Sequence, residues 1–186
     1  RVPADSRTTH YALSLRIVPE EDRFSGEVSI DVTLVSPRRV LWLHMQDMRA
    51  QEATITPAGG APIALDVVRM GDDGLAALRP ASDVPAGRAT VRIVYDAPFD
   101  RTLKGIYRVD TAGLSYAFSQ FEAISARLAF PCFDEPAFKT PFDITLTVKR
   151  ENAAITNTAA VEETDAGSGF KRIRYATTLP LPTYLL

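Results

Sequence analysis

Apolar and polar residues alternate over long stretches of this chain, and the alternation limits the folds that are open to it. From residue 28 to residue 34, every second residue is Val, Ile or Leu, and the residues between them are polar or charged. Residues 142–149 repeat the pattern. A period of two places successive side chains on opposite faces of a β-strand. The chain is therefore predicted to consist of half-buried strands.

Further strands are predicted where alternation combines with β-branched and aromatic residues, and clusters of Gly, Pro and Asp separate them at a spacing of roughly 8–12 residues. No long helical periodicity occurs, and only residues 123–129 favour a short helix. These signals predict an all-β fold, an antiparallel sandwich or a related multi-sheet arrangement. The additional strands are predicted at residues 11–18, 40–45, 53–56, 63–69, 89–95, 104–109, 114–118 and 171–177.

The bulk composition narrows the class of protein. With 186 residues, of which 46% are hydrophobic and 24% charged, the chain is expected to form a single soluble domain over residues 1–186. Its net charge of −2 is spread without a basic cluster, so nucleic acid is not an expected partner. No apolar run is long enough to span a membrane. No signal peptide is recognised, and the compartment stays open between cytoplasm and bacterial periplasm. Many alanines and a large excess of arginine over lysine favour a bacterial source.

The cysteine and the histidines are weak candidates for chemistry. Cys132 has no histidine near it in sequence to activate its thiol, so it is expected to be a buried small hydrophobic residue. His10 and His44 lie on different predicted strands and form no H-x-x-x-H pair. Neither is predicted to bind a metal.

Asp134 and Glu135 form an acidic pair, but neighbouring residues of an extended chain point to opposite faces. They are therefore not expected to act together on one substrate atom. Their predicted role is structural: to accept hydrogen bonds from loop N–H groups and to pair with nearby arginines such as Arg127.

Glu122 is the strongest candidate for a binding residue. It follows a predicted strand and begins the irregular segment "SQFEAISARLAFPCFDEPAFKTPF" of residues 119–142. Apolar neighbours are expected to desolvate its carboxylate partly, so that it needs a cationic partner. From spacing alone, that partner is either a ligand or Arg127.

The same segment resembles the signature of the N-terminal domain in zinc aminopeptidases of the aminopeptidase N family, which belong to the gluzincins. The resemblance extends along the chain. "HYALSLRIVPEEDRFSGEVSIDV" is similar to the opening strand pair of that domain, "LWLHMQDM" to its next strand, and "KGIYR" to the motif before the signature. "TLPLPTYLL" resembles the crossing into the catalytic domain.

This resemblance implies a saddle-shaped β-domain that packs on a catalytic domain and supplies substrate-binding residues to it. Matched position by position, Glu122 corresponds to the acid that binds the free α-amino group of the peptide. Gln120 corresponds to the amide that lines the pocket for the first side chain, and Ala123 completes the segment. The resemblance also implies a cis peptide bond between Glu122 and Ala123.

The zinc motif H-E-x-x-H does not occur in residues 1–186. The resemblance therefore implies that the zinc ligands and the catalytic residues lie in the missing catalytic domain, and that this chain alone is inactive. Two other interpretations stay open. One is a catalytically inactive relative that uses the same domain as a scaffold. The other is a free-standing β-sandwich that binds carbohydrate or protein.

Overall fold

The computed structural model describes residues 6–186 and confirms an all-β fold. Two short 3₁₀ helices are the only helical elements in this part of the chain, and η1 falls within the predicted residues 123–129. The elements are β1 Ser6–Arg16, β2 Arg23–Leu34, β3 Leu41–His44, β4 Arg49–Pro57, β5 Ile63–Arg69, β6 Leu75–Pro80, β7 Gly87–Pro98, β8 Gly105–Thr111, β9 Leu114–Gln120, η1 Ala126–Leu128, β10 Phe142–Lys149, β11 Ala160–Gly167, β12 Phe170–Tyr175 and η2 Thr183–Leu185.

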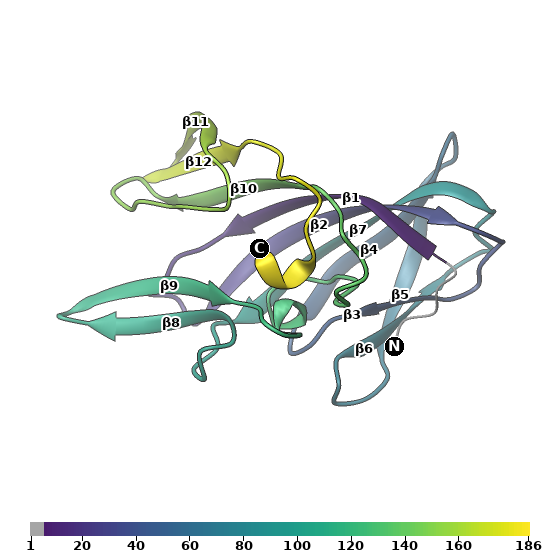
Figure 1. Ribbon diagram of the computed structural model, residues 1–186, viewed down its shortest axis with the longest axis horizontal. Helices are drawn as coiled ribbons and strands as arrows, with labels where there is room; N and C mark the ends of the chain where they lie inside the picture. Colours follow the sequence, from purple (N-terminus) through teal and green to yellow (C-terminus); the bar gives the residue numbers. More distant parts are fainter. Residues whose placement is uncertain (1–5) are drawn as a thin grey trace.

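Ten strands form one large sheet in the order β11-β12-β10-β1-β2-β7-β4-β5-β6-β3. Its central strands show the alternation expected from the sequence, since β2 and β10 bury every second residue. The sheet is mixed because β1 pairs in parallel with β10, whereas its other pairs are antiparallel. This parallel pair joins strands from opposite ends of the chain and holds β10 to β12 against the first strands (Figure 1).

Strands β8 and β9 form a separate two-stranded hairpin, which projects from the body of the molecule (Figure 1). A lone hairpin is only marginally stable, so its base must be held by neighbouring structure. Gly105 provides that contact at a φ of 60°, where a Cβ atom would lie 2.7 Å from the Cβ of Leu128 in η1. The absence of a side chain therefore lets the hairpin base pack directly on η1.

Two strands were not predicted. β6 is a short apolar run without alternation, and its central residues are buried on both faces. β11 is exposed along its whole length and carries acidic residues at the edge of the sheet. Charged, exposed edge strands are common because they discourage pairing with other chains.

The core lies on one side of the central strands and continues into residues 121–142. Tyr11 of β1 stacks on Phe142 of β10 with ring centroids 4.6 Å apart, and the edge of Phe130 packs against both rings. The signature segment is thus part of the main core. In the part of the chain that the structure describes, no helix has the length and apolarity needed to cross a membrane.

Candidate functional site

Gln120 and Glu122 lie where the hairpin ends and the core segment begins. Gln120 is the last residue of β9, opposite Gly105, and its Oε1 atom accepts the N–H of Glu122 at 3.2 Å. The Glu122–Ala123 peptide bond is cis, as the resemblance implied. Phe121 and Ser125 are buried on either side, and the Ser125 N–H donates to the Phe121 carbonyl at 2.9 Å. This turn directs Glu122 outward.

The environment of Glu122 differs from the sequence-based expectation. Glu122 and Ala123 are exposed, so the apolar neighbours do not desolvate the carboxylate in this chain. Within residues 6–186, the Glu122 side chain forms no ion pair and accepts no hydrogen bond. Arg127, the alternative partner, binds Asp134 instead. Glu122 therefore offers an unpaired carboxylate at the end of the hairpin.

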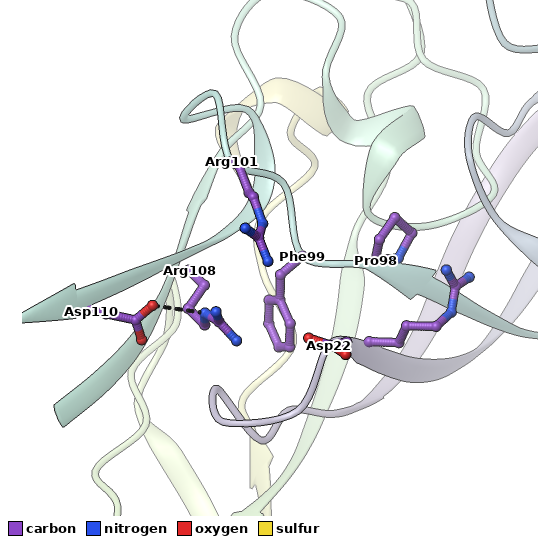
Figure 2. A pocket seen from close by; sticks show the side chains of 7 residues that line it. Asp22, Pro98, Phe99, Arg101, Arg108 and Asp110 are labelled. Atoms are coloured by element: carbon purple, nitrogen blue, oxygen red, sulfur yellow. Dashed lines mark ion pairs between the residues drawn. The ribbon is translucent and has the colours of Figure 1, made fainter. Parts of the chain in front are cut away.

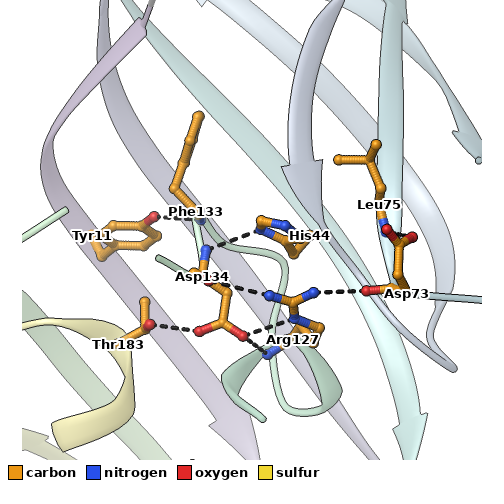
Figure 3. A network of polar contacts seen from close by, with 8 residues as sticks. All are labelled: Tyr11, His44, Asp73, Leu75, Arg127, Phe133, Asp134 and Thr183. Atoms are coloured by element: carbon orange, nitrogen blue, oxygen red, sulfur yellow. Dashed lines mark hydrogen bonds and ion pairs between the residues drawn. The ribbon is translucent and has the colours of Figure 1, made fainter. Parts of the chain in front are cut away.

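Arg127 and Asp134, further along the same segment, form a buried ion pair (Figure 3). The side chains are 9% and 1% exposed, and Nε of Arg127 lies 2.9 Å from Oδ2 of Asp134. The two terminal nitrogens of the Arg127 guanidinium donate to the Asp73 carbonyl at 2.7 Å and to the Asp134 carbonyl at 3.2 Å. Because burial of unpaired charge is costly, this near-complete pairing is what permits an arginine in the core.

Asp134 also connects the segment to two distant parts of the chain. Its Oδ1 atom accepts the hydroxyl of Thr183 in η2 at 2.7 Å, and its N–H donates to Nδ1 of His44 at 3.2 Å (Figure 3). The predicted structural role of Asp134 is confirmed. Burial, followed by the nearby Arg127 charge, lowers the pKa of His44. The neutral ring that results can accept the Asp134 hydrogen bond.

Two buried tyrosines fix the same segment from the sheet. The Tyr11 hydroxyl accepts the Phe133 N–H at 3.0 Å, and the Tyr95 hydroxyl donates to the Ala129 carbonyl at 2.9 Å. Gly26 makes room for the second of these, because a Cβ there would lie 2.6 Å from the Tyr95 ring. Cys132 lies among these groups, is fully buried, and has its thiol pKa raised by burial. Its predicted role as a packed hydrophobic residue is consistent with this environment.

His10 has partners that the sequence did not reveal. Its Nε2 atom lies 3.1 Å from Oδ2 of Asp143, and Nδ1 lies 3.9 Å from Oδ2 of Asp31. Because β1, β2 and β10 pair side by side, residues far apart in sequence meet on one face of the sheet. Among residues 6–186, however, no group of three or more His, Cys, Asp or Glu side chains is arranged to hold a metal ion.

One face of β9 carries exposed apolar side chains that lead toward Gln120. Leu114, Tyr116 and Phe118 are 59%, 42% and 50% exposed, and Tyr107 of β8 packs beside Phe118 at a centroid distance of 5.8 Å. These residues precede the signature segment, in which Ile124 is the exposed large hydrophobic residue. Residues 125–134 of the segment are turned into the core, with Leu128 half-buried.

Sequence comparisons place the chain among the N-terminal domains of peptidases. The family model of the Peptidase M1 N-terminal domain matches residues 7–185, and the chain belongs to that family. It is 32% identical to Aminopeptidase M1-D of Oryza sativa subsp. japonica, over 100% of this chain and 21% of that protein. It is 29% identical to the Puromycin-sensitive aminopeptidase of Caenorhabditis elegans, over 100% of this chain and 20% of that protein. A bacterial relative, Aminopeptidase N of Acetobacter pasteurianus, is 29% identical over 95% of this chain and 50% of its own length.

The chain spans about a fifth of the length of the first two relatives. The family assignment from the "QFEA" and "FPCFDEP" motifs is thereby confirmed. The relatives come from plant, animal and bacterial sources, so the expected bacterial origin stays a prediction. The roles of Gln120, Glu122 and Ala123 are likewise predictions.

Proposed function

We propose that this domain belongs to a zinc aminopeptidase that removes N-terminal residues from peptides, and that it supplies the groups that recognise the peptide N-terminus. Glu122 binds the α-ammonium group, Gln120 lines the pocket for the first side chain, and Ala123 completes the wall beside them. The observation that supports the proposal is the unpaired Glu122 carboxylate on a turn that is held by hydrogen bonds to Gln120 and Phe121.

An exopeptidase must measure one residue from the amino end of its substrate. A carboxylate at a fixed position does this because it forms a charge-assisted hydrogen bond to the terminal ammonium, which an internal residue lacks. A substrate without that charge would leave the acid buried and unpaired, which is the basis of strong discrimination. Glu122 is exposed in this chain, so another part of the protein must cover it to create the water-poor site.

The apolar face of β9 supports the presence of such a cover. Leu114, Tyr116 and Phe118 expose large apolar surface on a strand that ends at Gln120. An apolar face of this kind is typical of a surface that packs on another domain. In this proposal, the catalytic domain packs on the hairpin and closes over Gln120 and Glu122.

In this proposal, the zinc ion is bound by the catalytic domain that covers the site. The described residues 6–186 contain no suitable ligand cluster, and H-E-x-x-H does not occur in the sequence. When bound in the complete enzyme, zinc would activate water for attack on the first peptide bond. No step involving the metal is assigned to residues of this chain, whose contribution is to bind and orient the substrate.

The test is to compare the complete protein with its Glu122→Gln variant on an aminoacyl-anilide substrate. Loss of the charge should reduce kcat/KM by about 2–5 kcal/mol in transition-state free energy, which exceeds tenfold. Glu151→Gln, at an exposed position away from the turn, is the matched control and should retain full activity. An active enzyme that is indifferent to Glu122→Gln would refute the amine-binding role. A folded but inactive wild-type protein would instead favour the scaffold interpretation.

A further inference from the structure

A pocket lies where the hairpin leaves the large sheet (Figure 2). Gln120 is paired with Gly105, and alternation along β8 places Arg108 on the opposite face from Gly105. The cavity measures about 500 Å³, which is within the range of small-molecule sites. It is lined by Asp22, Arg23, Pro98, Phe99, Arg101, Arg108 and Asp110.

The three arginines of this pocket differ in their partners. Arg23 is paired with Asp96, and Nε of Arg108 lies 3.1 Å from Oδ2 of Asp110. Within residues 6–186, the Arg101 side chain has no hydrogen bond or ion pair. Figure 2 shows the guanidinium groups of Arg101 and Arg108 both directed toward Phe99. Two like charges that face one cavity favour an anion between them, and the guanidinium fork matches a carboxylate.

A negative charge lies in the same cavity. The Asp22 carboxylate has no hydrogen bond or ion pair with another described residue, and Figure 2 places it beyond the Phe99 ring from Arg101. The Phe99 ring itself is buried against Phe24, at a centroid distance of 5.3 Å, and separates the two charges with an apolar surface. The pocket thus presents an unpaired cation and an unpaired anion to one ligand.

Backbone contacts hold together the two segments that carry Asp22 and Arg101. The Phe99 N–H donates to the Asp22 carbonyl at 3.3 Å, which ties the turn before β2 to the end of β7. The Asp100 carboxylate accepts the N–H of Lys104 at 3.1 Å and the hydroxyl of Thr102 at 2.9 Å, and so closes the loop that carries Arg101. Anchoring this backbone reduces the conformational entropy that is lost when a ligand binds.

We propose that this pocket binds a small zwitterion of the class of free α-amino acids and short peptides. The carboxylate lies against Arg101 and Arg108, and the ammonium lies against Asp22. The site is separate from Glu122 and does not depend on the function proposed for it. In an aminopeptidase its ligand would be a product or a short peptide.

The test measures binding by calorimetry to the complete protein in a Glu122→Gln background, so that the proposed amine site does not contribute. The probes are alanine and alanyl-N-methylalanine, whose methylated peptide bond resists hydrolysis. N-acetylalanine keeps only the carboxylate, and alaninamide keeps only the ammonium. Arg101→Gln and Asp22→Asn are the test variants. Arg88→Gln, at an exposed residue of β7 outside the pocket, is the control.

At least one zwitterion should bind, and each test variant should weaken it by about fivefold to tenfold, the range expected for one charge-assisted contact. N-acetylalanine and alaninamide should bind the wild-type pocket more weakly than the zwitterion by a similar factor. Arg88→Gln should leave the affinity for the zwitterion unchanged. Preference for alanine or for the dipeptide identifies which source of the zwitterion fits. Absence of binding, equal binding of N-acetylalanine, or insensitivity to Arg101→Gln and Asp22→Asn would overturn the proposal. None of these results depends on activity, so they are distinguishable from failure of the Glu122 role.

Discussion

The signature segment consists of two regions that use charged residues in opposite ways. In residues 120–124, Gln120 and Glu122 are exposed, and the Glu122 carboxylate has no partner among the described residues. In residues 125–142, Arg127 and Asp134 are buried and have nearly every polar atom paired. Paired buried charges hold a structure in one arrangement, whereas unpaired exposed charges are available to a ligand. The buried region should therefore control stability, and the exposed region should control recognition.

The largest expected effect is loss of stability on removal of one member of the buried pair. Asp134→Ala leaves the Arg127 guanidinium without its carboxylate and Thr183 without its acceptor. The free energy of unfolding should fall by about 3–5 kcal/mol, as is typical when one charge of a buried pair is removed. Urea unfolding of the domain measures this change.

The double variant Arg127→Met with Asp134→Leu provides the control, because it removes both charges and keeps apolar volume. It should recover much of the stability lost in the single variant. If the single variant were as stable as wild type, the ion pair would not hold the segment, and the contrast between the two regions would fail.

The next effect is a pH dependence of the free energy of unfolding, which arises from His44. Because burial and Arg127 lower its pKa in the folded state, the unfolded chain binds the proton at a higher pH, about 6.5. The stabilising contribution is present above that value and is lost as pH falls toward the folded pKa. Protonation would also remove the acceptor for the Asp134 N–H.

The measurement is the free energy of unfolding between pH 7 and pH 5, for wild type and for His44→Asn. The wild-type protein should lose more stability on acidification than the variant, because only wild type titrates at this position. Parallel pH dependence in the two proteins would show that His44 is not held neutral by the network.

The sequence predicted features that depend on local pattern. Alternation identified β2 and β10, and isolation from activating groups indicated that Cys132 is buried. The family resemblance identified the cis peptide bond between Glu122 and Ala123. β6 was missed because a strand that is buried on both faces does not alternate, and β11 was missed because an exposed edge carries no apolar period.

Partners across strands could not be predicted from the same patterns. The contact of His10 with Asp143 depends on the parallel pairing of β1 with β10, and that of Asp134 with Thr183 joins residues 49 positions apart. The exposure of Glu122 was also missed. Apolar neighbours in sequence suggested desolvation, but Phe121 turns into the core while Ile124 turns out to solvent. Neighbours in sequence do not define the surroundings of a residue at a tight turn.

The smallest expected effect is the stability change of Glu122→Gln, and it tests the exposed half of the comparison directly. An exposed carboxylate with no partner contributes little to the fold, so the free energy of unfolding should change by no more than about 0.5 kcal/mol. Glu151→Gln gives the corresponding value for an exposed acid elsewhere on the surface. Thermal unfolding of the three proteins measures both differences. A Glu122→Gln variant that is much less stable than its control would mean that Glu122 supports the turn, and any activity lost in the variant would then reflect structure. A variant that unfolds at the same temperature as wild type but no longer hydrolyses peptides would assign the carboxylate to recognition alone.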